Sequence, residues 1–276
     1  MPNWTRNRIV AMGTELQIHN FIKRTTSRIN NKRTFDFDKI IPSPEVYKYD
    51  LRSNERRIVR ACAYAIMLDI TTHDDKPGYN DLITYAANYL DCAPKEFVVS
   101  KSECKKHLSY HVGLTDAVTG ELLIRTIDDV RKIGIQLLQA YHHYNTRDWY
   151  EWCCKYWGTK WNHTDTLTEL AYNSNDPTAK AMTVSITFDT AWCAPMPIFN
   201  QLFKDYPELQ FDVVYADEEI GRGVGSITVR NKYRTYNSYD DDSNDAMCQA
   251  ISLWEMWDDY EYDREIEQWV YVGDYK

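Results

Sequence analysis

The chain has 276 residues, of which 43% are hydrophobic and 26% are charged, and its formal net charge is −9. This composition is ordinary for a soluble globular protein and excludes wholesale disorder. The charge changes from +7 over residues 1–60 to −12 over residues 205–276, and the acidic end argues against a generic nucleic-acid binder. The 21 tyrosines and nine tryptophans favour buried rings together with a surplus for interfaces.

No targeting segment is indicated. The first eight residues contain no apolar signal-sequence core, and the longest apolar run, residues 61–70, is too short to span a bilayer. The seven cysteines include no Cys-x-x-Cys pair, unlike a secreted disulfide framework. We therefore expect a cytoplasmic protein with reduced thiols.

The first 45 residues predict a strand, a helix and a second strand. Arg8–Met12 reads as a short strand, and Thr14 is a suitable cap for the helix that follows. Phe35–Ile41 predicts the second strand, which the prolines after it end. The helix is expected to bury one face, formed by Leu16, Ile18, Phe21 and Ile22.

Residues 46–120 have a helical pattern and are interpreted as an inserted helical lobe. The clearest amphipathic segments in it are Glu55–Asp69 and Asp81–Leu90. A further helix, Thr126–Tyr144, is predicted after the lobe. The main domain then comprises residues 1–45 and 121–276.

After residue 180 the pattern alternates between strands and helices. Strands are expected where apolar residues recur at every second position, and helices where they recur at helical spacing. The chain as a whole predicts an α+β fold, with an antiparallel-rich sheet and helices packed on one face. The elements predicted here are Thr183–Thr187, Ile198–Tyr206, Leu209–Ala216, Ser226–Tyr236 and a final helix, Asp245–Trp257.

Between Trp149 and Trp161 the chain carries four tryptophans and two tyrosines in thirteen residues. Such a density suits either a packed helix or a stacking platform for a ligand. Packing is favoured, because Trp149 and Trp152 share one helix face. The tryptophans predicted to lie in the core are Trp149, Trp152, Trp157, Trp161 and Trp192.

Several motifs resemble one known family. They are Met-Pro-Asn-Trp at residues 1–4, Phe-Asp-Phe-Asp-Lys-Ile-Ile-Pro at 35–42, the Trp-rich segment, Phe-Asp-Thr-Ala-Trp at 188–192 and Tyr-Ala-Asp-Glu at 215–218. In this order they resemble the YubB-like family of phage and plasmid proteins. The resemblance covers residues 1–45 and about 140–235. It implies a ferredoxin-like domain and a mobile-element origin, but no activity, because that family is uncharacterised.

A run of three carboxylates, Asp217, Glu218 and Glu219, offers the oxygen ligands that magnesium or calcium requires. A solvated strand end is the more usual interpretation of such a run of charges. The neighbouring sequence from Gly221 to Gly225 resembles a phosphate loop only superficially. Because a strand, not a helix, is predicted after it, we favour a flexible hairpin.

The segment Tyr239–Asp263 combines carboxylates with aromatic rings. We predict an acidic helix face that docks on a basic protein surface or imitates a nucleic-acid backbone, with a solvated terminal helix as the alternative. The residues expected to contact a partner are Asp241, Asp242, Trp257, Asp258, Asp259, Tyr260 and Glu261.

The leading functional hypothesis is a non-enzymatic phage or mobile-element accessory protein in the cytoplasm of a bacterial host. It would bind and inhibit a host protein or protein complex, such as an anti-phage defence system. No cofactor is indicated, and the sequence leaves open whether the chain forms homo-oligomers. Neither a membrane nor a nucleic acid is expected as a direct ligand. Two alternatives remain: a divalent-metal-dependent hydrolase or nucleotide-modifying enzyme, and a nucleic-acid-binding protein that uses the basic N-terminal half.

Overall fold

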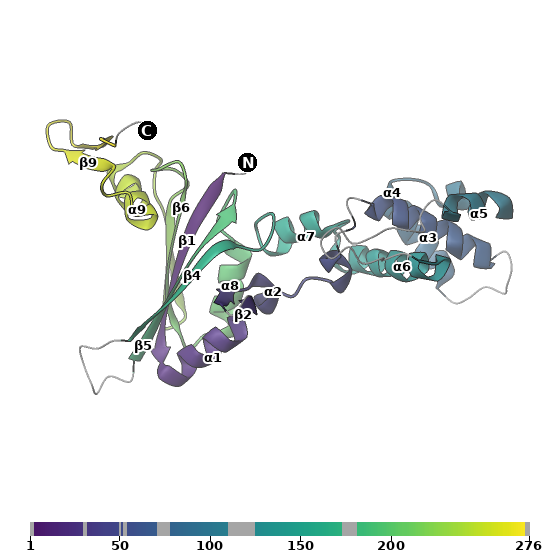
Figure 1. The fold of residues 1–276 in the computed structure, drawn as a ribbon, viewed down its shortest axis with the longest axis horizontal. Coiled ribbons are helices and arrows are strands. Elements are labelled where there is room, and N and C mark those ends of the chain that lie inside the picture. Colours follow the sequence, from purple (N-terminus) through teal and green to yellow (C-terminus); the bar gives the residue numbers. More distant parts are fainter. Residues whose placement is uncertain are drawn as a thin grey trace. The chain divides into compact units, whose positions relative to one another are not determined.

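The chain folds into two compact units (Figure 1). The sheet unit consists of Met1–Pro42 and Cys153–Lys276, and the helical unit consists of Ser43–Trp152. The computed structural model describes residues 3–29, 32–49, 51, 54–70, 78–109, 125–172 and 181–273.

The sheet unit is built on a six-stranded antiparallel sheet with the strand order β4-β5-β1-β6-β7-β8. Its first four strands are joined by helices α1 (Glu15–Thr25) and α8 (Met196–Asp205) in the order β1-α1-β4-β5-α8-β6. This is the split β-α-β arrangement of a ferredoxin-like domain, extended by β7 and β8. The predicted α+β class with an antiparallel sheet is thus confirmed. The strands are β1 (Trp4–Thr14), β4 (Thr164–Tyr172), β5 (Ala181–Ala191), β6 (Gln210–Asp217), β7 (Gly225–Arg230) and β8 (Tyr233–Ser238).

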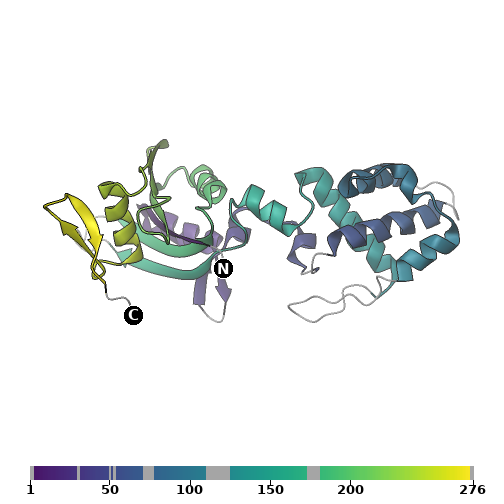
Figure 2. The ribbon, with the colours of Figure 1, turned by 90° about the horizontal axis from the view of Figure 1, so that it is seen from above.

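Helices α1 and α8 cover one face of this sheet (Figures 1 and 2). The strand residues that point to them are fully buried, and Phe211 of β6 contacts both Phe21 of α1 and Phe203 of α8. α1 begins at a capping box, in which Thr14 Oγ1 accepts from Gln17 N and Gln17 Oε1 accepts from Thr14 N. The predicted cap is therefore confirmed. Leu16, in contrast, is 71% exposed and does not belong to the buried face.

The opposite face carries helix α9 (Asn244–Trp254) at one end of the sheet (Figure 1). Arg6 of β1 lies opposite Ala216 of β6 and Asp189 of β5. Its guanidinium group pairs with both carboxylate oxygens of Asp189 at 2.9 and 3.0 Å, and it lies 4.2 Å from the ring centre of Trp254. A partly buried ion pair therefore joins β1 to β5, and the contact of the same guanidinium group with Trp254 connects these strands to the last helix.

Two strand predictions were wrong. The predicted strand Phe35–Ile41 contains a short helix, α2 (Phe37–Ile40), because Asp36 caps it by accepting from Asp38 N at 3.0 Å. Only Lys32–Phe35 (β3) is extended, paired with Thr26–Ile29 (β2). The predicted strand Ser226–Tyr236 is in fact β7 and β8, separated by Asn231 and Lys232. Both residues have positive φ, at 50° and 71°, as the tight turns of β-hairpins require.

The helical unit is centred on α3 (Glu55–Ile70), which packs against α4 (Tyr79–Leu90), α5 (Lys101–Ser109) and α6 (Ile127–Tyr144). α3 carries hydrophobic side chains on nearly all its sides, and most of these side chains are buried. Gly134 of α6 permits a close approach to α3, since a Cβ at this position would lie 2.3 Å from Cβ of Cys62. Two short 3₁₀ helices, Glu45–Lys48 (η1) and Pro94–Phe97 (η2), complete the unit.

The second domain boundary differs from the prediction. We placed it at residue 120, which lies outside the described residues, and assigned the helix Thr126–Tyr144 to the main domain. The observed boundary follows Trp152, and α6 belongs to the helical unit because it packs along α3. None of the helices in the described part of the chain is long and apolar enough for a bilayer span.

Candidate functional site

The last helix ends earlier than predicted. We expected a helix from Asp245 to Trp257, but α9 stops at Trp254 because Glu255 adopts a left-handed conformation, with φ 59°. Met256 N then donates to Ile251 O at 3.0 Å and closes the helix end. The acidic and aromatic residues that follow therefore do not lie on a helix face.

These residues form a β-hairpin instead. Strands β9 (Tyr260–Asp263) and β10 (Gln268–Tyr271) pair in an antiparallel register, with Tyr260 opposite Tyr271 and Tyr262 opposite Trp269. Alternate residues of a strand point to the same side, so all four aromatic side chains lie on one side of the hairpin. We call this side, together with Trp257, the aromatic face.

The rings of the aromatic face contact one another and remain accessible. Trp269 lies between Trp257 and Tyr262, with ring centres 5.8 and 5.6 Å away, and Tyr260 meets Tyr271 at 5.3 Å. Trp257, Tyr262 and Tyr271 are 49%, 43% and 45% exposed. A cluster of large rings that keeps this much exposure is typical of a protein-binding surface.

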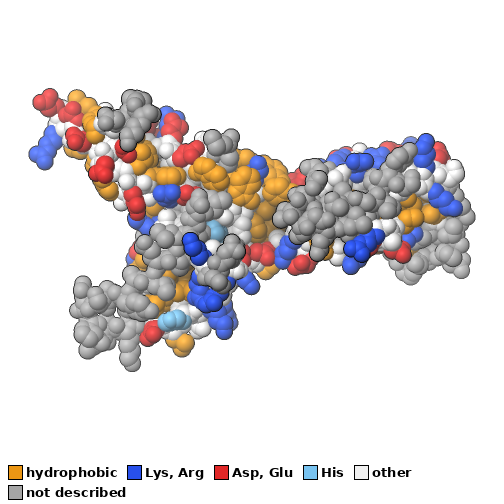
Figure 3. All heavy atoms as spheres, in the orientation of Figure 1, with side chains coloured by type: hydrophobic (Ala, Val, Ile, Leu, Met, Phe, Trp, Pro, Cys, Tyr) orange, Lys and Arg blue, Asp and Glu red, His pale blue; other side chains and the backbone are white. Residues whose placement is uncertain are grey.

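The hairpin that carries the aromatic face and the turn before it are strongly acidic. Residues 255–273 contain seven Asp or Glu residues and one Arg, a net charge of −6. Figure 3 shows acidic and hydrophobic side chains side by side at the end of the molecule where β9 lies. None of these carboxylates forms an ion pair with another described residue. They are Glu255, Asp258, Asp259, Glu261, Asp263, Glu265 and Glu267.

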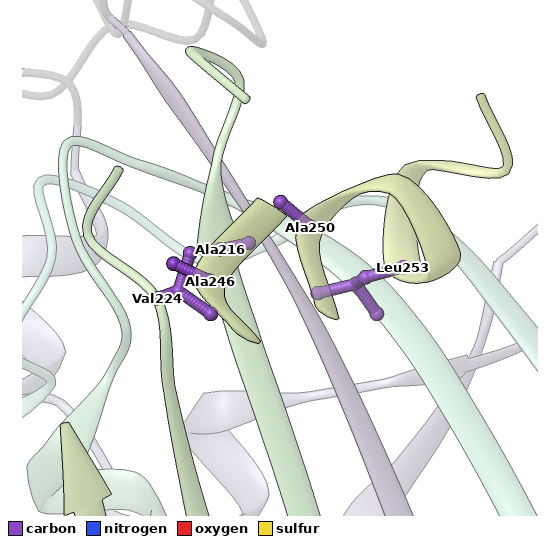
Figure 4. Packing of buried hydrophobic residues seen from close by; sticks show 5 residues of the cluster. All are labelled: Ala216, Val224, Ala246, Ala250 and Leu253. Atoms are coloured by element: carbon purple, nitrogen blue, oxygen red, sulfur yellow. The ribbon is translucent and has the colours of Figure 1, made fainter. Parts of the chain in front are cut away.

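The hairpin is attached to the sheet unit through α9. Ser243 caps this helix by accepting from Ala246 N at 3.2 Å, and the neighbouring Asn244 donates from Nδ2 to Glu267 O of the hairpin loop at 2.7 Å. α9 in turn packs its small buried residues on β6 and the start of β7. Figure 4 shows this cluster, which consists of Ala216, Val224, Ala246, Ala250 and Leu253.

The structure places the predicted contact residues in two locations. Trp257, Asp258, Asp259, Tyr260 and Glu261 lie in the hairpin and the turn before it. The remaining two, Asp241 and Asp242, lie in the turn before α9, where the first accepts from Gly223 N at 3.3 Å. The carboxylate of Asp242 lies 3.9 Å from the guanidinium group of Arg222. These two residues hold the loop between β6 and β7 and are not part of the aromatic face.

The predicted metal ligands do not converge. The described residues contain no group of three or more His, Cys, Asp or Glu side chains that could hold a metal ion. Asp217 ends β6, while Glu218 and Glu219 are exposed in the following turn, where Glu219 lies 3.4 Å from Arg222. The structure therefore does not bring Asp217, Glu218 and Glu219 together around one point, and it places Glu218 and Glu219 in an exposed turn at the strand end. The glycines after them lead directly into a strand that pairs with β6, which is the hairpin we favoured.

The tryptophan-rich segment includes α7 (Trp149–Tyr156) and its tryptophans have mixed environments. Trp152 and Trp157 are buried, and Trp157 Nε1 donates to Ile41 O at 2.9 Å. Trp149 and Trp161 are half-buried. Trp192 is 43% exposed, so the prediction that it lies in the core was wrong. Its φ of 73° turns it outward, and Lys160 Nζ lies within 5.2 Å of its ring centre.

Three residues of the aromatic face, Tyr262, Trp269 and Tyr271, were not among the predicted contact residues. The available signal was the repetition of aromatic residues at every second position in Tyr260-Glu-Tyr262 and in Trp269-Val-Tyr271. This period of two is the mark of a strand, and the six residues between the two runs, five of them polar or charged, leave room for a hairpin turn.

One comparison with known proteins bears on the fold of the sheet unit. Residues 156–265 match the family model described as the ferredoxin-like domain in Api92-like protein. The crystal structure of the protein api92 from Yersinia pseudotuberculosis is similar at 10% sequence identity and a TM-score of 0.42, over 87% of this chain and 99% of that chain. No curated protein matches the sequence.

Proposed function

We propose that this chain is a non-enzymatic interaction protein that binds a basic surface of a partner protein through the aromatic face of its C-terminal hairpin. The observation that supports this proposal most directly is the coincidence of exposed aromatic rings with a net charge of −6 on a single hairpin. A few residues, among which tryptophan, tyrosine and arginine are enriched, supply most of the binding free energy at protein interfaces, and surrounding charges steer association with an oppositely charged partner.

The resemblance to phage and plasmid proteins supports a more specific version of the proposal. The partner is a protein complex of the bacterial host, such as an anti-phage defence system, and binding inhibits it. The chain works in the host cytoplasm as an accessory protein of a mobile element. A small acidic protein can inhibit in this way without a reaction centre, because it occupies a basic surface that the complex needs for its own substrate.

The first experiment identifies the partner by affinity purification from nuclease-treated host lysate, which removes proteins held only through nucleic acid. The tagged wild-type chain is compared with a double variant of the rings, Trp257→Ala with Tyr262→Ala, and with a charge-reversal variant, Asp258→Lys with Glu261→Lys. The matched control is Glu208→Lys, which reverses an exposed charge outside the hairpin. We expect one complex to be retained by the wild type and the control and lost by both hairpin variants.

The second experiment measures binding and activity with the purified partner. Both hairpin variants should weaken binding at least tenfold, and the affinity of the wild type should fall as salt is added. The activity of the complex should fall when the wild-type chain is added and persist with the variants. If the wild type and the hairpin variants retain the same proteins to the same extent, the hairpin is not the binding surface.

A further inference from the structure

We infer that the aromatic face recognises an arginine side chain on an exposed segment of the partner, at a site formed by Tyr260, Tyr271 and Asp259. This inference rests on the proposed function, since it names the chemistry that the hairpin recognises. The two rings bind the guanidinium plane, and the carboxylate binds its charge.

The geometry of the two tyrosines suits a planar cation. They lie directly opposite each other on β9 and β10. Their ring centres are 5.3 Å apart and their planes are inclined at 73°. Two rings that meet at a steep angle form a corner, in which a guanidinium group can stack on one ring while the other borders it. Cations within about 6 Å of a ring centre are attracted by its π electrons.

Asp259 supplies the negative charge at this corner. Its carbonyl oxygen accepts from Val272 N at 2.8 Å and from Gly273 N at 3.2 Å, so backbone hydrogen bonds fix Asp259 beside the end of β10. A Cβ at Gly273 would lie 2.7 Å from both Oδ1 of Asp259 and the hydroxyl oxygen of Tyr271. The carboxylate and this hydroxyl therefore lie beside the same glycine at the end of β10.

Electrostatics agree with this placement. Partial burial raises the pKa of Tyr260, and the neighbouring Tyr271 and the negative charge of Asp259 raise it further. The Asp259 charge thus acts on the ring pair itself. Among the described residues no lysine or arginine pairs with Asp259, so its charge remains available to a partner.

The chain already contains the same kind of contact elsewhere. Arg6 pairs with both oxygens of Asp189 while its guanidinium group lies 4.2 Å from the ring centre of Trp254. An arginine suits this combination better than a lysine, because its planar group stacks on a ring and presents two donors to one carboxylate at the same time. At the hairpin the two rings and the carboxylate lie together in a similar combination, and the partner provides the arginine.

The test uses the full chain and synthetic peptides, followed by NMR. A capped hexapeptide with two arginines is compared with the same peptide containing lysine, and with one containing citrulline, which keeps the shape and hydrogen-bonding plane but lacks the charge. We expect the arginine peptide to shift the amide signals of residues 257–273. Lysine should weaken binding severalfold and citrulline at least tenfold, because a charge-assisted contact is about twice as strong as a neutral one.

Protein variants locate the site. Asp259→Asn keeps the side-chain shape and should weaken binding of the arginine peptide about tenfold, and Tyr271→Leu should weaken it similarly. The matched control, Glu208→Gln, removes one exposed charge outside the hairpin and should change the affinity less than twofold. Unchanged signals in β1 and β5 confirm that each variant is folded.

Three results would overturn the inference: equal binding of the arginine and citrulline peptides, equal effects of Asp259→Asn and Glu208→Gln, or signal changes confined to residues outside 257–273. If any of these occurs while the hairpin variants still lose the partner complex, the arginine site is wrong and the proposed function stands. If the arginine peptide binds as expected but no complex is retained, the proposed function is wrong and the site stands.

Discussion

Truncation of one leucine should release the C-terminal hairpin without unfolding the sheet. Leu253 of α9 is 3% exposed and packs in the cluster with Ala216, Val224 and the alanines of the same helix. Leu→Ala substitutions at buried sites cost about 2–5 kcal/mol, depending on how far the surroundings close the cavity. Alanine neighbours cannot reach into the cavity, but α9 lies at the surface and can shift. We therefore expect a cost of about 3 kcal/mol for Leu253→Ala.

The destabilisation caused by Leu253→Ala should appear as local opening of α9 and the hairpin. The α9 cluster lies on the opposite side of the sheet from α1 and α8, so its loss leaves the main core intact. Amide exchange should accelerate about 100-fold over residues 244–271, which is the factor that corresponds to about 3 kcal/mol, and remain unchanged in β1 and β5. The control is Leu16→Ala, an identical truncation at a residue that is 71% exposed, with an expected effect below about 0.5 kcal/mol. If β1 and β5 lose as much protection as α9, the reasoning is refuted.

Two further substitutions test close packing and buried charge. Gly225→Ala should destabilise the sheet unit by about 1–3 kcal/mol in urea unfolding, because the new Cβ would lie 2.3 Å from the hydroxyl oxygen of Tyr215. This cost should disappear when the same substitution is made in a Tyr215→Ala background. An equal cost in that background would contradict the proposed clash. Burial raises the pKa of the Cys62 thiol from 9.0 to about 12. The folded state therefore keeps a proton that the unfolded state loses above pH 9, and the helical unit should lose stability as the pH rises from 9 towards 12, at about 1.4 kcal/mol per pH unit from this group. Cys62→Ala should make the slope shallower by that amount, and an unchanged slope would show that the thiol does not contribute.

Sequence patterns within one segment predicted the helices that are stabilised by contacts within the same segment. Thr14 forms its capping box within three residues, and α3, α4 and α6 carry long helical periodicity, so their positions follow from the sequence. The same reasoning failed at Phe35–Ile41, where the pattern suits a strand or a helix equally. Asp36 decides between them by capping α2, and a capping aspartate inside an apolar run is a weak signal beside the run itself.

The domain boundary and the environment of Trp192 depend on contacts between distant residues. α6 has the pattern of an ordinary amphipathic helix, and its packing along α3, with a close approach of Gly134 to Cys62, shows that it belongs with α3. Trp192 follows a buried strand and has the residue type of a core position. Its left-handed backbone, fixed by a 2.8 Å hydrogen bond from Trp192 N to Asn3 O, directs it to the surface. Neither contact leaves a pattern in the nearby sequence.

The segment proposed to contact a partner was given the wrong secondary structure, and the correction changes its chemistry. On a helix, residues 257–263 would spread rings and carboxylates around the axis, because neighbours on a helix point about 100° apart. In a hairpin the period of two separates Tyr260 and Tyr262 from Glu261 and brings the rings of two strands together. The aromatic side chains thus form one continuous surface bordered by charge. A hairpin can bind a planar cation with these groups, whereas the predicted helix would have offered only a diffuse negative potential.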